Sequence, residues 1–166
     1  MNFEQKLHTL GLNLPDPPKP VASYVPFVQQ GNLLYLSGML PFEDGQLRLK
    51  GKVGQTLNTA QGKEAAKIAL LNALAVIKSA IGSLDLIEQI VRMSLYVACT
   101  PDFTAQPTVA NGASDLLVEL LGERGRHARL ALAAPVLPLD APVELELIVA
   151  VSRMGAIKDS VLPEVV

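Results

Sequence analysis

The sequence predicts an α+β domain with one mixed β-sheet and two helices on one of its faces. The first observation is the order of the segments, which runs hairpin, helix, strand, helix and two strands, typical of a single sheet with helices packed on it. The second is that the strands are almost wholly apolar, so both sheet faces need cover although the helices supply only one. The third is composition. The 166-residue chain is 49% hydrophobic and 18% charged, so we expect other copies of the chain to close the second face.

The N-terminal segment predicts a short helix, an extended arm and a hairpin. Residues 2–10 place apolar side chains on one side of one or two helical turns, and the prolines within 14–20 then force an extended path. The runs 24–30 and 33–37 flank a short Gly-Asn turn, a pattern that favours two hairpin strands. Pro26 indicates that the first of them is an edge strand or carries a bulge.

A long helix and an interior strand follow. Residues 60–80 are rich in strong helix formers, Asn58 or Thr59 can cap their start, and Gly82 ends the run. Residues 87–98 are β-branched and apolar enough for a strand with neighbours on both sides.

A second helix and two strands complete the expected domain. The helix begins near Pro107, which suits the first helical position, and Gly122 is its natural stop. Its apolar stripe consists of Val109, Ala113, Leu116, Leu117 and Leu120. Residues 128–134 and 143–152 then predict two strands joined by a proline-bearing connection.

Length and terminal sequences predict one domain over residues 1–166, with an N-terminal arm at 1–20, a core at 21–152 and a C-terminal tail at 153–166. The start lacks the basic and apolar regions of a secretory signal, and no stretch approaches a membrane span. We therefore expect a soluble cytoplasmic protein with no membrane partner.

Composition argues against several kinds of partner. The formal charge of −2 and the absence of Trp, with three Tyr and four Phe, provide neither an attractive field for phosphates nor many stacking platforms, so nucleic acid is not expected as the main partner. Cys99 is the only cysteine, which excludes intrachain disulfides and cysteine-based zinc sites. No phosphate loop or metal-ligand spacing is present, so we expect neither a metal nor an organic cofactor.

Positive charges gather in the run Arg124-Gly125-Arg126-His127-Ala128-Arg129. Arg129 lies inside a predicted strand, where a guanidinium is costly unless paired, and its planar fork suits a carboxylate or phosphate. A structural ion pair with Glu144 or Glu146 and a ligand site are equally compatible with this position. Arg124, Arg126 and His127 follow the second helix, where cations offset the helix dipole, although His127 also remains a candidate proton donor.

Negative charges gather on the last predicted strand. Glu144 and Glu146 alternate with apolar residues, so both carboxylates point to one sheet face about 7 Å apart and could serve acid/base chemistry. We expect one of them to be sequestered, with a raised pKa or a fixed cationic partner. In a simple hairpin Arg129 would lie opposite a residue near Val149, about 17 Å from Glu144. The hypothesis is therefore that Arg129 and Glu144 meet across a subunit boundary.

Two further positions carry weak signals. Ser37-Gly38 ends the second strand, where backbone amides could bind a ligand oxygen, although a plain turn is the commoner meaning. Asn111-Gly112 lies within the second helix despite poor helix propensity, which indicates close approach or a donated hydrogen bond, or simple tolerance.

Together these residues resemble the RidA/YjgF family of reactive-intermediate deaminases over about residues 20–152. The order and spacing that match are those of Tyr24, the run Leu36-Ser37-Gly38-Met39-Leu40-Pro41, Ala128-Arg129, Leu137-Pro138 and Val143-Glu144-Leu145-Glu146. More specifically, further runs resemble a longer branch of the family, often labelled YjgF/chorismate-mutase-like or "putative endoribonuclease L-PSP". These runs are Gly51-Lys52-Val53-Gly54, Gln61-Gly62, Pro101-Asp102-Phe103, Asn111-Gly112-Ala113-Ser114-Asp115-Leu116 and Gly125-Arg126-His127-Ala128-Arg129.

The resemblance implies a chorismate-mutase-like fold, a homotrimer and ligand clefts between subunits. It implies that Arg129 binds the carboxylate of a 2-imino acid or its enamine form, and that Glu144 directs the water that hydrolyses it. Tyr24, Ser37, Gly38 and Asn111 match positions that line the same cleft.

The residues after the arginine depart from the pattern of the deaminases. After the arginine the deaminases usually carry Ser and then a small residue or Cys, whereas this chain has Leu130 and Ala131. Longer segments around 51–57 and before Asn111 also reshape the expected pocket. The leading hypothesis is a deaminase of small carboxylate-bearing imines that yields a 2-keto acid and ammonia. The alternative is a non-catalytic module that binds or senses a carboxylate metabolite, and a ribonuclease is the third hypothesis.

Overall fold

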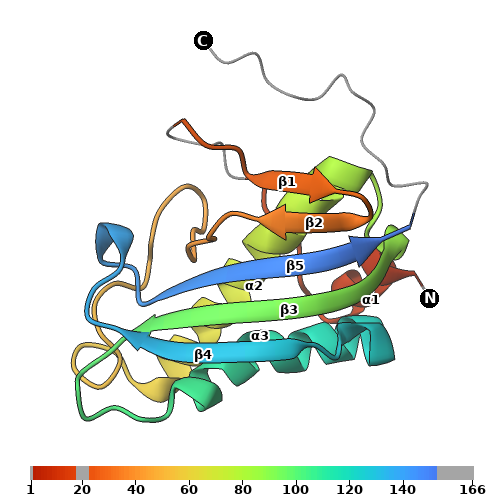
Figure 1. Ribbon diagram of the computed structural model, residues 1–166. Coiled ribbons are helices and arrows are strands. Elements are labelled where there is room, and N and C mark those ends of the chain that lie inside the picture. Colours follow the sequence, from red (N-terminus) through yellow and green to blue (C-terminus); the bar gives the residue numbers. More distant parts are fainter. Residues whose placement is uncertain (1, 18–22, 153–166) are drawn as a thin grey trace.

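A five-stranded sheet with strand order β1-β2-β5-β3-β4 organises the molecule, and the helices pack behind it in the view of Figure 1. The computed structural model describes residues 2–17 and 23–152; the predicted tail at 153–166 and the end of the arm lie outside these residues. The strands are β1 (Phe27–Gln30), β2 (Leu33–Leu36), β3 (Ile87–Ala98), β4 (Ala128–Ala134) and β5 (Val143–Val151). The helices are α1 (Phe3–Thr9), α2 (Thr59–Ile81) and α3 (Gln106–Leu121), with 3₁₀ turns η1 (Leu84–Leu86), η2 (Gly122–Gly125) and η3 (Pro138–Asp140). The predicted α+β class and the mixed sheet are confirmed.

Local signals in the sequence account for the long helix. Asn58 caps α2 by accepting a hydrogen bond from the backbone of Gln61, whose side chain accepts one from the Asn58 backbone in return. Gly82 ends the helix with a φ of 84°, a conformation that glycine adopts without strain. Two such signals at the ends of an alanine-rich run predicted the bounds of α2 closely.

The last two strands do not form the simple hairpin that the sequence left possible. β3 lies between them, antiparallel to β5 and parallel to β4. The connection 135–142 is long enough to pass the end of one strand, and the parallel β3–β4 pair is joined through α3 as in other strand-helix-strand units. Arg129 therefore lies level with Met93 of β3 and, through it, with Leu147 of β5, rather than opposite Val149.

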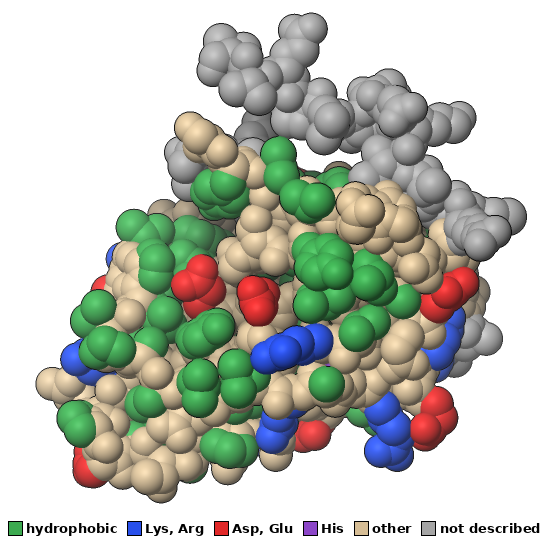
Figure 2. Space-filling model, viewed as in Figure 1, with side chains coloured by type: hydrophobic (Ala, Val, Ile, Leu, Met, Phe, Trp, Pro, Cys, Tyr) green, Lys and Arg blue, Asp and Glu red, His purple; other side chains and the backbone are tan. Residues whose placement is uncertain are grey.

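One sheet face packs on the helices and the other is open. Along β5 the residues with odd numbers are buried and those with even numbers are partly exposed. α1 adds Phe3 and Leu7 to the core on the helical side. The open face carries exposed apolar side chains, and Figure 2 shows hydrophobic groups spread over it; among them are Val28, Tyr35 and Leu132. Within the described residues, no helix has the length and apolarity needed to cross a lipid bilayer.

Candidate active site

Glu144 lies on the open face of β5, opposite Tyr96 of β3. Its carboxylate covers the backbone of Gly38, where a Cβ added to the glycine would lie only 2.1 Å from Glu144 Oε1. Two backbone hydrogen bonds hold the segment after Gly38 against β5: Met39 N donates to Leu145 O at 2.7 Å, and Leu145 N donates to Met39 O at 3.0 Å. Glycine at position 38 is therefore a condition for the observed position of the carboxylate.

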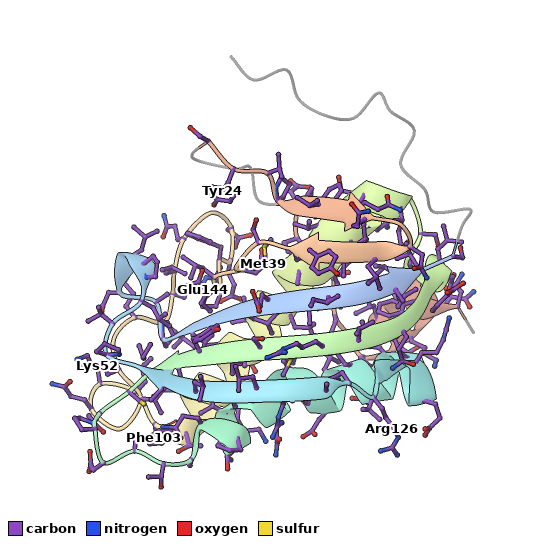
Figure 3. All side chains as sticks on the ribbon, in the orientation of Figure 1. Tyr24, Met39, Lys52, Phe103, Arg126 and Glu144 are labelled. Carbon is purple, nitrogen blue, oxygen red and sulfur yellow. The ribbon has the colours of Figure 1, made fainter. Side chains whose placement is uncertain are left out.

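Ser37 holds the segment that carries Tyr24 beside this carboxylate. The Ser37 hydroxyl donates to Val25 O at 2.6 Å, and the Ser37 amide donates to Pro26 O at 2.9 Å. Tyr24 is 48% exposed, and Figure 3 places it at the same end of the sheet as Met39 and Glu144. We call Tyr24, Ser37, Gly38 and Glu144 the glutamate half-site.

Burial raises the pKa of the Glu144 carboxyl above the ordinary value of a glutamate, and the negative charge of Glu146 raises it further. No cation lies within ion-pair distance of Glu144 among the described residues. Of the two outcomes expected for a sequestered glutamate, the structure thus has the raised pKa and not the fixed cationic partner. A carboxyl of this kind can exchange a proton nearer neutral pH than an exposed one.

Arg129 lies on the other side of the sheet, on β4 against α3. Its Nη1 donates to Asn111 Oδ1 at 2.7 Å and to Ser114 Oγ at 3.2 Å. Ser114 in turn lies 3.0 Å from His127 Nε2, and His127 Nδ1 lies 2.6 Å from Gly125 O. We call Asn111, Ser114, His127 and Arg129 the arginine half-site.

Helix and strand periodicity explain why these four side chains meet. Asn111 and Ser114 are three residues apart on α3 and share a helix face, while His127 and Arg129 are two apart and point to the same side. The sequence indicates Asn111 and Arg129 as site residues but not Ser114. The i, i+3 spacing of Asn111 and Ser114 was the signal available for it.

α3 approaches α2 closely at Gly112, where a Cβ would lie 2.1 Å from the carbonyl oxygen of Lys63. Of the alternatives left open for Asn111-Gly112, the structure therefore bears out close approach. The hydrogen bond that the structure describes for Asn111 is an accepted one, from Arg129 Nη1, and not the donated one considered from the sequence.

Arg129 and Glu144 belong to opposite sides of one sheet. They are offset by three residues along the strands, about 10 Å, and by two strand spacings, about 10 Å more. No ion pair joins Arg129 to Glu144 or Glu146 in the described part of the chain. The structural ion pair considered from the sequence is therefore absent from this fold.

The remaining cations of the run have structural contacts. Arg124 donates to Ile87 O at 2.8 Å, at the start of β3, and Arg126 pairs with Glu123 at 3.0 Å on the surface. Arg124 thus ties η2 to β3, a contact that the sequence did not predict. Within residues 2–17 and 23–152, no cluster of three His, Cys, Asp or Glu side chains could hold a metal ion.

Comparison with known proteins gives relatives that cover nearly the whole chain. Protein TCP17 of Trypanosoma cruzi is 37% identical over 89% of this chain and 92% of its own. The crystal structure of Atu1372 from Agrobacterium tumefaciens, of unknown function, is 42% identical with a TM-score of 0.86, covering 90% of this chain and 92% of its own. A "putative endoribonuclease" from Shewanella oneidensis is 34% identical with a TM-score of 0.88, covering 91% and 100%.

More distant structures share the fold. E. coli TdcF, solved with bound serine, is 21% identical with a TM-score of 0.61 and covers 82% of this chain and 94% of its own. The model of the family described as "YjgF/chorismate mutase-like, putative endoribonuclease" matches residues 4–151. The chain therefore belongs to this family, within the wider RidA/YjgF/RutC group.

Proposed function

We propose that the protein hydrolyses small reactive 2-imino or enamine acids, such as 2-aminoacrylate, to a 2-keto acid and ammonia. The observation that carries the proposal is the pair of uncompensated charges, a guanidinium at Arg129 and a half-buried carboxyl at Glu144. A substrate with a carboxylate at one end and an imine beside it matches both groups. The family also includes enamine and imine deaminases.

The proposed cleft lies between two copies of the chain. Within one copy the two half-sites face opposite sides of the sheet, so a single ligand of a few atoms cannot touch both. The open apolar face offers a surface for a second copy, and a homotrimer would repeat the same contact three times. The glutamate half-site of one subunit and the arginine half-site of the next then form one cleft.

Each half-site has a defined task in the proposed hydrolysis. Arg129 binds the substrate carboxylate through a bidentate contact. Glu144 takes a proton from a water molecule as the water oxygen attacks the carbon of the protonated imine, which gives a neutral carbinolamine. Glu144 then returns the proton to the amine nitrogen, the C–N bond breaks and ammonia leaves, and the hydroxyl proton passes to the departing ammonia or to solvent as the carbonyl forms. Modest positioning and one acid/base group are enough for this reaction, because such enamines also hydrolyse in water without a catalyst.

The cleft differs from the usual deaminase pattern at Leu130 and Ala131. Leu130 is level with Ser94 of β3 and points to the open face, away from Arg129. Ala131 shares the side of Arg129 but has no polar group. In TdcF the bound ligand is serine, an amino acid with a carboxylate, and a ligand of that size and charge suits the proposed cleft.

The test generates 2-aminoacrylate with a dehydratase and follows its disappearance. We expect the wild type to accelerate the loss, and Arg129→Ala and Glu144→Gln each to abolish most of the acceleration. Arg126→Gln, which changes an exposed arginine of the same run, serves as the matched control. Binding of 2-ketobutyrate by a wild type that gives no acceleration would instead favour the metabolite-binding module.

A mixing experiment tests the shared cleft. When the two inactive variants are unfolded together and refolded as mixed trimers, about one cleft in four combines an intact Arg129 with an intact Glu144. We expect about a quarter of wild-type activity to return. A stable monomer in solution, or no recovery from verified mixed trimers, would contradict the intersubunit cleft.

A further inference from the structure

The hydrogen bonds of the arginine half-site have a single consistent direction. Gly125 O can only accept, so Nδ1 of His127, 2.6 Å away, carries the proton. In the neutral imidazole Nε2 then carries no proton, and it accepts a hydrogen bond from the Ser114 hydroxyl at 3.0 Å. The hydroxyl proton of Ser114 is thereby directed away from Arg129.

This direction determines which edge of Arg129 is free. Ser114 Oγ turns a lone pair to Arg129 Nη1, and Asn111 Oδ1 accepts from the same nitrogen. Nη1 carries two hydrogens, and the two acceptors use both. The edge formed by Nε and Nη2 has no hydrogen-bond partner among the described residues, and it is the geometry that binds a carboxylate with two parallel bonds.

Close packing holds the acceptor that begins the chain of bonds. Gly125 is buried against α3, where a Cβ would lie 2.1 Å from Leu117 O. Because this contact is with backbone, it cannot relax by a side-chain rotation. The Gly125 carbonyl, which selects the His127 tautomer, is therefore held in place by packing against the same helix that carries Asn111 and Ser114.

We propose that His127 and Ser114 are positioning residues that hold Arg129 by Nη1 and present its Nε–Nη2 edge to a ligand carboxylate. The identity of the ligand rests on the proposed function. The orientation of Arg129 does not, because it is a property of the protein without ligand.

Two substitutions of His127 separate the two ends of the imidazole. In His127→Gln the side-chain oxygen can reach the position of Nε2 and accept from Ser114, whereas in His127→Asn the amide can replace only Nδ1 and bind Gly125 O. We expect Arg129 Nε to be ordered on the ps–ns timescale by ¹⁵N relaxation in wild type and His127→Gln, and mobile in His127→Asn and Ser114→Ala. Arg126→Gln should behave as wild type.

Ligand binding provides the second measurement. For 2-ketobutyrate we expect Kd to rise about tenfold in His127→Asn and Ser114→Ala, and to stay within about threefold in His127→Gln. If the deaminase activity is present, KM should rise with Kd while kcat changes less, because neither residue touches the reacting atoms. Folding of each variant is checked by its urea midpoint.

Three results would overturn the proposal. They are an Nε2-protonated tautomer of His127 in ¹⁵N spectra, an Arg129 side chain equally ordered in His127→Asn, and a His127→Gln variant as impaired as His127→Asn. Failure of the deaminase assay alone would refute the proposed function and leave the relaxation and tautomer results to decide this inference.

Discussion

Substituting Gly38 by alanine should remove catalysis and leave the fold intact. The added Cβ would lie 2.1 Å from Glu144 Oε1, while ordinary van der Waals contact begins near 3.4 Å, so the carboxylate must move by more than 1 Å. A displacement of about 1 Å in a catalytic group can cost about 100-fold in rate. The backbone has no reason to unfold, because Gly38 is exposed and does not have a left-handed φ.

The assay combines kcat/KM for 2-aminoacrylate with urea unfolding. We expect about a 100-fold fall in kcat/KM, and a free energy of unfolding within about 1 kcal/mol of wild type, since the neighbour that must move is a flexible side-chain end. The affinity for 2-ketobutyrate should change less than the rate. Full activity in Gly38→Ala would refute the role given to the position of Glu144, and a large loss of stability would refute the argument that only a side chain is displaced.

Three other predictions concern Gly112, Glu144 and Arg124. In Gly112→Ala the added Cβ meets the backbone carbonyl of Lys63, so the free energy of unfolding measured with urea should fall by about 1–3 kcal/mol. This loss exceeds the gain from the higher helix propensity of alanine. Gly62→Ala, whose Cβ meets only methyl groups at 3.1–3.3 Å, should lose less. The raised pKa of Glu144 means that the folded state binds more protons than the unfolded state between the ordinary and the raised pKa, so stability should fall as pH rises through this window. Glu144→Gln should remove that slope and be more stable at neutral pH, and an unchanged slope would contradict the assignment. Arg124→Ala should lose about 1 kcal/mol with its bond to Ile87 O while 2-ketobutyrate affinity stays unchanged.

Local chemistry made most of the elements predictable from the sequence. The ends of α2 follow from a capping asparagine and a terminal glycine, and Pro26 correctly indicated that β1 lies at an edge. The alternation of Glu144 and Glu146 with apolar residues predicted their common face, because a strand of period two leaves no other arrangement. These signals act over a few residues, so they survive whatever the rest of the chain does.

The pairing of the last strands was not predictable in the same way. The apolar strands 128–134 and 143–151 carry no feature that states whether they pair with each other or with 87–98. A connection of moderate length permits both. The correct order depends on contacts between segments far apart in sequence, and α3 must cross the sheet to place β4 parallel to β3.

The side to which Arg129 points was equally hidden, and it matters most for function. Both faces of β4 carry small or apolar residues, so the pattern around Arg129 could not assign it to a face. Pairing with buried Met93 turns Arg129 to α3, where Asn111 and Ser114 accept from it. Had Arg129 pointed the other way, it would have shared the open face with the glutamates, and a structural ion pair would have become possible. The packing of β4 on α3 is therefore what keeps the guanidinium available for a ligand.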